Sequence, residues 1–224
     1  MGEQTMLVAQ GLRKQYFRKG REAARYFDAV SRIDLTLARG EVLELVGRSG
    51  SGKTTLLSML AGLLTPTEGA VLFEGTDLYA LDDAVRSRLR NEHFGVVPQG
   101  QTPLADLTVM QNVCLPYCLY HEPGDVESRA LQLLESLGIA ALSECYPAEL
   151  SGGEMRRMAI ARALVCEPDV VFADEPTGDL DDENTQVVLQ TLRDVANAGA
   201  AVLLVTHEQA AAAFADRTLR LNAS

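Results

Sequence analysis

The most informative stretch of this chain is a five-residue motif, Leu150-Ser151-Gly152-Gly153-Glu154. Upstream of it, residues 47–54 read GRSGSGKT, which is a complete phosphate-binding loop pattern. Downstream of it, residues 170–175 read VVFADE, an apolar run that ends in two carboxylates. A phosphate loop alone indicates only that a nucleoside triphosphate binds. The three motifs in this order are typical of one class of nucleotide-binding protein.

The phosphate loop lies in the context that such a loop requires, between an apolar strand-like run at 42–46 and a helical pattern at 54–63. Its glycines let the backbone turn tightly and point its N–H groups inward, and the next helix N-terminus adds to this anion cradle. Lys53 supplies a cation for the β- and γ-phosphates, and Thr54 offers a hydroxyl to Mg²⁺. The residues expected to hold the nucleotide here are Gly47, Ser49, Gly50, Ser51, Gly52, Lys53, Thr54 and Thr55.

With these motifs, the chain resembles the ATP-binding subunit of ABC transporters from about residue 7 to residue 221. The resemblance implies an ATP hydrolase that uses ATP and Mg²⁺. Asp174, at the end of its apolar run, is expected to hold Mg²⁺, and Glu175 is expected to be the general base that polarises the attacking water. His207 follows the apolar run 202–206 and matches the family's switch histidine, which contacts the γ-phosphate.

Two further nucleotide contacts follow from the resemblance, and both leave alternatives open. Gln99 matches the glutamine that touches Mg²⁺ and the attacking water, with Gln101 as a nearby rival. Tyr16 matches the aromatic residue that stacks on adenine, and the adjacent Phe17 could take its place.

Tyr26 and Phe27 are weaker candidates for that stacking role. The basic residues between positions 13 and 25 are interpreted as a solvated loop, in preference to a lipid-headgroup contact.

The fold is predicted to be α/β, because strand-like and helical patterns alternate, which is typical of a largely parallel sheet. Strands are expected near residues 6–9, 33–37, 42–46, 70–73, 94–97, 170–173, 202–206 and 218–221. Helices are expected at 54–63, 126–137, 151–165 and 182–198. The resemblance adds short antiparallel strands near the N-terminus.

The domain prediction is a single ABC-type P-loop ATPase over residues 1–224. Residues 1–99 and 167–224 form its core, and residues 100–166 form an inserted helical subdomain that carries the LSGGE motif. Within the core, Glu44 is unusual because it interrupts an apolar strand pattern. A partner on a neighbouring strand or helix, or partial exposure, is the preferred explanation over a catalytic role, since buried charges are usually paired.

Composition excludes several classes of function. The net charge of −11 argues against broad nucleic-acid binding. No apolar run approaches the roughly 18–20 residues that span a bilayer, and residues 1–5 show no signal segment. We therefore expect a cytoplasmic protein with reduced cysteines. Cys114, Cys118 and His121 could share a helix face, but Pro116 interrupts them and packing is preferred over a metal site.

The chain is predicted to work as one half of a dimer. The N-terminus of the helix after Ser151 is a second end that can bind an anion, yet the chain contains no second phosphate loop whose nucleotide it could contact. The resemblance implies a homodimer packed head to tail, in which Ser151, Gly152, Gly153 and Glu154 complete the partner's ATP site. The D-loop at 178–181 would cross the dimer axis, with Asp179 in an unusual place and Asp181 near the nucleotide.

The implied partners are integral membrane permease subunits, which would hold the chain on the inner face of the cell membrane. Residues 107–116, LTVMQNVCLP, resemble the lipoprotein-release, macrolide-export and cell-division group. An export or force-transmitting system is therefore the preferred function. An importer subunit, for amino acids for instance, and a soluble ABC-type regulator without a transport role are the alternatives.

Overall fold

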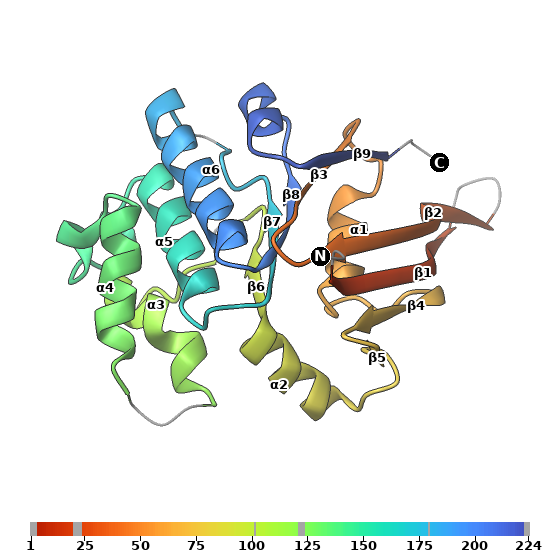
Figure 1. Ribbon diagram of the computed structural model, residues 1–224, viewed down its shortest axis with the longest axis horizontal. Coiled ribbons are helices and arrows are strands. Elements are labelled where there is room, and N and C mark those ends of the chain that lie inside the picture. The colour runs from red at the N-terminus through yellow and green to blue at the C-terminus, as the bar shows by residue number, and fades with distance from the viewer. Residues whose placement is uncertain (1–3, 20–23, 101, 121–123, 179, 222–224) are drawn as a thin grey trace.

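The computed structural model describes residues 4–19, 24–100, 102–120, 124–178 and 180–221. A parallel sheet of five strands lies at its centre in the order β6-β7-β8-β3-β9 (Figure 1). The strands are β3 (Val42–Gly47), β6 (Phe94–Val97), β7 (Val170–Asp174), β8 (Ala201–Val205) and β9 (Arg217–Leu221). The predicted α/β fold with a parallel sheet is confirmed. All carboxyl ends lie at one edge of the sheet, where ligands bind in such folds.

The central strands are apolar on both faces because each face is covered. Successive side chains of a strand point to opposite sides. Val171 and Ala173 of β7 therefore join a core with the helices that follow β6, while Val170 and Phe172 join a second core on the other side. All five residues of β7 are buried, so the strand reads as a continuous apolar run before Asp174.

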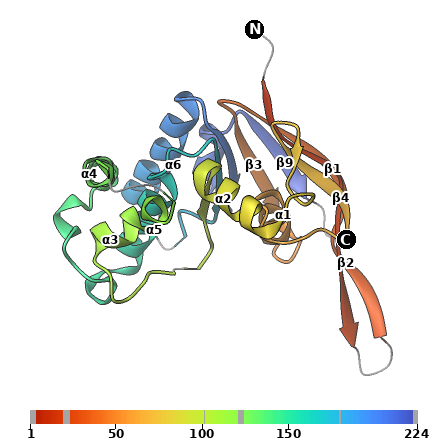
Figure 2. The ribbon, with the colours of Figure 1, turned by 90° about the horizontal axis from the view of Figure 1, so that it is seen from below.

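A second, antiparallel sheet covers the other core in the order β2-β1-β4-β5. It consists of β1 (Thr5–Lys19), β2 (Ala24–Ala38), β4 (Glu68–Phe73) and β5 (Thr76–Asp77). Figure 2 shows the far end of the β1–β2 hairpin extending away from the rest of the molecule. Both strands of this hairpin are far longer than the predicted segments.

The interpretation of residues 13–25 as a solvated loop is wrong for the described part of that segment, which is strand. The first of its basic residues is held by carboxylates: Arg13 donates to Asp28 at 3.1 Å and to Glu68 at 2.7 Å. Lys14 Nζ donates to the Thr65 carbonyl oxygen at 2.7 Å. Polar residues that pair across strands leave no apolar alternation, and this explains why the sequence pattern missed the hairpin.

The helices are α1 (Lys53–Leu60), α2 (Asp83–His93), α3 (Val109–Cys118), α4 (Val126–Ser136), α5 (Gly152–Leu164) and α6 (Asp182–Asn197). Short 3-10 turns cover Ala140–Leu142, Pro147–Glu149 and Gln209–Ala213. Between β6 and β7 the described residues contain helices α3, α4 and α5 and no strand, and these helices lie to one side of the sheet (Figure 1). None of the described helices is long and apolar enough to cross a membrane.

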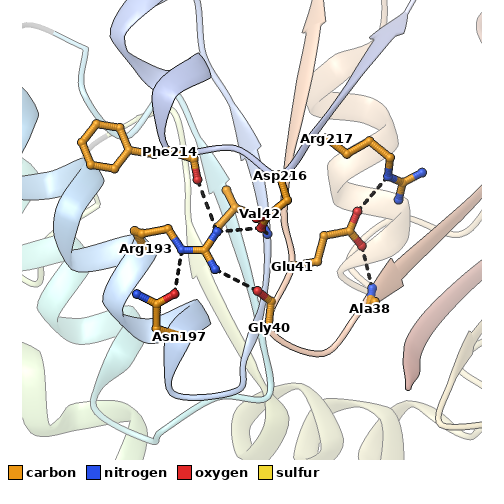
Figure 3. Close-up of polar contacts among 9 residues, drawn as sticks. All are labelled: Ala38, Gly40, Glu41, Val42, Arg193, Asn197, Phe214, Asp216 and Arg217. Carbon is orange, nitrogen blue, oxygen red and sulfur yellow. Dashed lines mark hydrogen bonds and ion pairs between the residues drawn. The ribbon is translucent and has the colours of Figure 1, made fainter. Parts of the chain in front are cut away.

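A polar network fastens α6 to the sheet at the edge opposite the carboxyl ends (Figure 3). Arg193 donates to Asp216 Oδ2 at 2.6 Å and to the Gly40 carbonyl oxygen at 2.9 Å. Asp216 Oδ2 also accepts from the Val42 N–H at 2.8 Å. Burial raises the pKa of Asp216, but the Val42 N–H and Arg193 outweigh it, and the net pKa is lowered. The network fixes where β3 and β9 begin.

Glu44 is buried and has a hydrogen-bond partner on a neighbouring strand, as expected from the sequence. Its side chain is 5% exposed, and its Oε2 accepts a 2.9 Å hydrogen bond from the Thr218 hydroxyl on the neighbouring strand β9. Cys114 is buried in α3, where burial raises the pKa of its thiol to about 11 and its Sγ contacts Met110 Sδ at 3.8 Å. His121 lies outside the described residues.

Candidate functional site

A polar cleft of about 390 Å³ opens at the carboxyl ends of β3, β7 and β8. Segments that lie far apart in the sequence meet in it, because parallel strands bring their ends to one edge. Its lining consists of Phe27, Asp28, Ala29, Ser49, Gly50, Gly52, Lys53, Thr54, Thr55, Gln99, Asp174, Glu175 and His207. The structure therefore brings together most of the residues singled out for the phosphates, the metal and the chemistry.

The phosphate loop depends on two glycines with left-handed backbones, Gly50 at φ 76° and Gly52 at φ 90°. Gly52 immediately precedes α1, and a Cβ on it would collide with the carbonyl oxygen of Ala29. Only glycine fits both constraints at this position. The loop consequently ends with the N–H groups of a helix terminus directed at the cleft.

Lys53 is the first residue of α1 and its side chain is turned back over the loop. Its Nζ donates to the Gly47 carbonyl oxygen at 2.8 Å and to that of Arg48 at 3.3 Å. The residue is only 8% exposed, which places a cation at the base of the cleft. Ser51 and Gly47 belong to the loop but do not line the cleft; the Ser51 hydroxyl is buried without a hydrogen-bond partner among the described residues.

Two adjacent carboxylates line the cleft where β7 ends. Asp174 is 2% exposed at the strand end. Glu175 adopts a left-handed φ of 51°, and its N–H donates to the Val205 carbonyl oxygen at 2.7 Å. A positive φ in a residue other than glycine costs about 1–2 kcal/mol and turns Glu175 away from the direction of the strand.

His207 contacts Glu175 with both its ring and its backbone. Its Nε2 lies 3.1 Å from Glu175 Oε1, and its N–H donates to Oε2 at 3.2 Å. Burial is the largest influence on this carboxyl group and raises its pKa, while His207 opposes the shift. The result is a partly desolvated carboxylate with a raised pKa at the cleft, the environment of a general base.

Gln99 lines the cleft just after β6, whereas its rival Gln101 lies outside the described residues. The backbone carbonyl oxygens of Pro98 and Gln99 each accept a 3.0 Å hydrogen bond from Arg156 of α5. This arginine was not singled out in the sequence. Nothing in its spacing shows that it reaches back to β6.

The aromatic residues of the hairpin divide between its two faces. Tyr16 pairs with Phe27, with ring centroids 6.0 Å apart, and Phe17 pairs with Tyr26 at 5.2 Å. Phe27 lines the cleft, whereas Tyr16, its partner in this pair, is not a lining residue. Phe27, a weaker stacking candidate from the sequence, is therefore the hairpin aromatic residue that lines the cleft. The register of the hairpin, which determines which ring faces the cleft, could not be deduced from the sequence alone.

The Ser151 motif and Asp181 are not part of this cleft. Ser151 caps α5: its hydroxyl accepts from the Glu154 N–H at 3.3 Å, and its own N–H donates to Glu154 Oε2 at 2.7 Å. Hydrogen bonds from Ser151 lower the pKa of Glu154. Asp181 caps α6 by accepting from the Asn184 N–H at 2.8 Å, and Asp179 lies outside the described residues.

Comparisons with known proteins agree with this geometry. The family model for the ABC transporter matches residues 30–178. The lipoprotein-releasing system ATP-binding protein LolD of Psychrobacter arcticus is 44% identical over 192 residues, covering 84% of this chain and 85% of that protein. LolD of Xanthomonas axonopodis pv. citri is 43% identical over 219 residues, covering 97% of this chain and 88% of that protein.

Solved structures show the same architecture. A bacterial ABC transporter cassette, solved as a dimer, matches with a TM-score of 0.90 and 31% identity over 97% of this chain and 94% of that one. A post-hydrolysis state of that cassette bound to ADP and Pi, also dimeric, matches with a TM-score of 0.90 and 31% identity over 96% of this chain and 94% of that chain.

Proposed function

Because this chain belongs to the ABC transporter family, in which it is an ATP-hydrolysing subunit that powers a membrane transport system, we propose that its transport system releases lipoproteins from the inner membrane. The support is the similarity to LolD proteins over 97% of this chain, together with a cleft that holds the residues for ATP hydrolysis. In this proposal the chain lies on the inner face of the membrane through its permease. Residues 100–166 form the helical subdomain, and residues 1–99 and 167–224 form the core.

The phosphate loop binds the triphosphate of ATP in this proposal. Its N–H groups and the start of α1 surround the phosphates, and Lys53 exchanges its loop carbonyl acceptors for the β- and γ-phosphate oxygens. Phe27 offers the adenine base an aromatic face in the cleft, and Tyr16, whose ring is tilted by 35° from that of Phe27, is the neighbouring stacking residue.

The donor set of the cleft fits Mg²⁺. Thr54, Gln99 and Asp174 offer a hydroxyl, an amide oxygen and a carboxylate, which are the hard oxygen ligands that this ion takes. When bound, Mg²⁺ neutralises charge on the phosphates. The contribution of the chain is to hold these three groups on separate elements that meet at one edge of the sheet.

Glu175 acts as the general base and orients the attacking water in this proposal. The water oxygen attacks the γ-phosphorus, its proton passes to the Glu175 carboxylate, and the bond from the γ-phosphorus to the ADP oxygen breaks. His207 contacts Glu175 and, in this proposal, also the γ-phosphate. His207 therefore links the orientation of the general base to the presence of that phosphate.

The Ser151 motif serves the ATP bound to a second copy of the chain. It presents the N-terminus of a 13-residue helix, and Ser151 itself is exposed. Since the motif does not line the cleft of its own subunit, a head-to-tail dimer lets each copy complete the site of the other. The D-loop with Asp181 lies at the axis of this dimer, and the dimeric state of the similar cassette supports the arrangement.

Affinity purification of this chain from native membranes in mild detergent, followed by mass spectrometry, tests the transport proposal. We expect a permease with few membrane spans and a large extracytoplasmic domain, carrying lipoprotein. A permease with many spans and a co-purifying solute-binding protein would indicate import. Recovery without any membrane protein would contradict a transport role and favour a soluble regulator.

A further inference from the structure

Arg156 of α5 points into the molecule although it lies close to the exposed Ser151 motif. It is 5% exposed, and its Nη1 donates to the carbonyl oxygens of Pro98 and Gln99 at 3.0 Å each. These two acceptors lie where the chain leaves β6 and begins to line the cleft. The helix that starts at Ser151 therefore holds the backbone of the cleft glutamine directly.

The same guanidinium group also lies beside the turn that follows the catalytic carboxylates. Its Nη2 is 3.7 Å from where a Cβ on Gly178 would be. The Gly178 N–H in turn donates to the Glu175 carbonyl oxygen at 3.2 Å. One side chain thus lies between the Ser151 helix, the Gln99 backbone and the Glu175 turn.

Arg156 is not needed merely to keep this loop on α5. Arg162, further along the same helix, donates to the Thr102 carbonyl oxygen at 2.9 Å and to the Thr102 hydroxyl at 3.2 Å. The loop therefore has a second attachment to α5, at Thr102, that does not involve Arg156. Arg156 contacts the loop only at the backbone of Pro98 and Gln99 among the described hydrogen bonds.

Stability alone does not explain a buried guanidinium at this place. Its hydrogen-bond acceptors among the described residues are neutral carbonyl oxygens, and its Nε has no partner among them. Burying a charge with such partners costs free energy that an uncharged side chain of similar length avoids. A rigid, planar group that reaches two successive carbonyls does, however, fix backbone geometry well.

We propose that Arg156 is a positioning residue that sets the Gln99 backbone relative to the Ser151 motif. Nucleotide held by the Ser151 motif of one subunit then biases the position of Gln99 in that same subunit's own cleft. This rests on the proposed function, in which the motif serves the partner's ATP. The two ATP sites of a dimer are thereby linked inside each chain through α5.

The test uses the full-length chain with Arg156→Met and Arg156→Lys, and with Arg129→Met as a matched control. Arg129 also donates to a backbone carbonyl oxygen, that of Val165 at 3.0 Å, but does not contact the Gln99 segment. We expect Arg156→Met to lower kcat for ATP by about tenfold to a hundredfold, as small misplacements of catalytic groups do. ATP affinity by calorimetry should stay within about twofold, since Arg156 does not line the cleft.

Hydrogen exchange distinguishes a positioning role of Arg156 from a general contribution to stability. The amides of Gln99 and Gly100 should exchange faster in Arg156→Met, while those of Thr102 and of α5 beyond Arg157 stay as in the wild type. Arg156→Lys should recover part of kcat and of the protection. Arg129→Met should leave both unchanged.

An unchanged kcat in a folded Arg156→Met variant would overturn the proposal, as would unchanged exchange at Gln99 and Gly100. If Arg156→Met does not fold, Arg156→Gln takes its place, because its short neutral amide cannot replace the guanidinium at the two carbonyl oxygens, and wild-type kcat and exchange in that variant would equally overturn the proposal. A wild-type chain that hydrolyses no ATP with its permease would instead contradict the proposed function, and the exchange data would still test whether Arg156 fixes the loop.

Discussion

His207 Nε2 lies 3.1 Å from Glu175 Oε1, and the His207 N–H donates to Oε2 of the same carboxylate. The two residues follow neighbouring parallel strands, β8 and β7, so the contact depends on the sheet rather than on either loop. The N–H of Glu175 donates back to the Val205 carbonyl oxygen at 2.7 Å. Backbone and side chain together hold the proposed base in one orientation.

The pH dependence of hydrolysis should report the environment of Glu175. Burial raises its pKa above the ordinary 4.5, so the carboxylate gains its proton at a higher pH than an exposed glutamate does. Because the base must be ionised, kcat/KM should fall on the acid side with an apparent pKa above 4.5. His207→Ala removes an influence that lowers this pKa and should move the acid limb further up. An acid limb at or below 4.5 in the wild type would contradict this assignment.

Lys53→Ala should weaken ATP binding by about tenfold to a hundredfold, the size expected for loss of hydrogen bonds to a charged group of ~1.5–3 kcal/mol. Calorimetry with Mg-ATP measures the change. Arg48→Ala is the matched control, because Arg48 is a cation of the same loop whose exposed side chain does not line the cleft. Equal effects of the two substitutions would mean that only the general charge of the loop matters.

The two ring pairs lie on opposite faces of the β1–β2 hairpin, so alanine substitutions can show which face contacts the nucleotide. Phe27→Ala and Tyr16→Ala should each weaken ATP affinity, since stacking on a base is worth about 1–3 kcal/mol. Phe17→Ala removes a 57% exposed ring from the opposite face and should leave the affinity unchanged. A loss of affinity in Phe17→Ala that matches the loss in Phe27→Ala would show that the hairpin is turned the other way when nucleotide binds.

Two glycines of the phosphate loop should differ in their tolerance of alanine. Both have positive φ, but a Cβ at Gly50 meets no heavy atom within 4 Å, whereas a Cβ at Gly52 collides with the Ala29 carbonyl oxygen. Gly50→Ala should cost about 1–2 kcal/mol of unfolding free energy. Gly52→Ala should cost a further ~1–3 kcal/mol because backbone must move. Denaturant unfolding without nucleotide measures both, and equal costs would contradict the predicted collision.

The positions of the parallel strands along the chain and most of the residues that line the cleft could be predicted, because apolar runs and motifs mark them in the sequence. Strands β7 and β8 are buried along their whole length, so their sequences are apolar up to the strand end, as before Asp174 in β7; β3 has one polar interruption, Glu44. Lys53, Glu175 and His207 all follow such runs. Their meeting is a consequence of parallel strands alone.

The features that the sequence did not indicate are those with little apolar signal. Helix α2 has no buried residue, so it carries no apolar stripe to detect. The β1–β2 hairpin relies on paired charges such as Arg13 with Asp28 and Glu68. The contacts of Arg156 and the place of Phe27 depend on how α5 and the hairpin pack, which no local pattern encodes.

The most direct test of the account is light scattering of Glu175→Gln with saturating Mg-ATP. Without its base the variant should bind ATP but hydrolyse it about 10²–10⁴-fold more slowly, so the nucleotide persists between two subunits. We expect a mass of twice 24.2 kDa with ATP and of 24.2 kDa without it. A variant that stays at 24.2 kDa, although calorimetry shows that it binds ATP, would contradict the head-to-tail dimer in which Ser151 completes the partner's site.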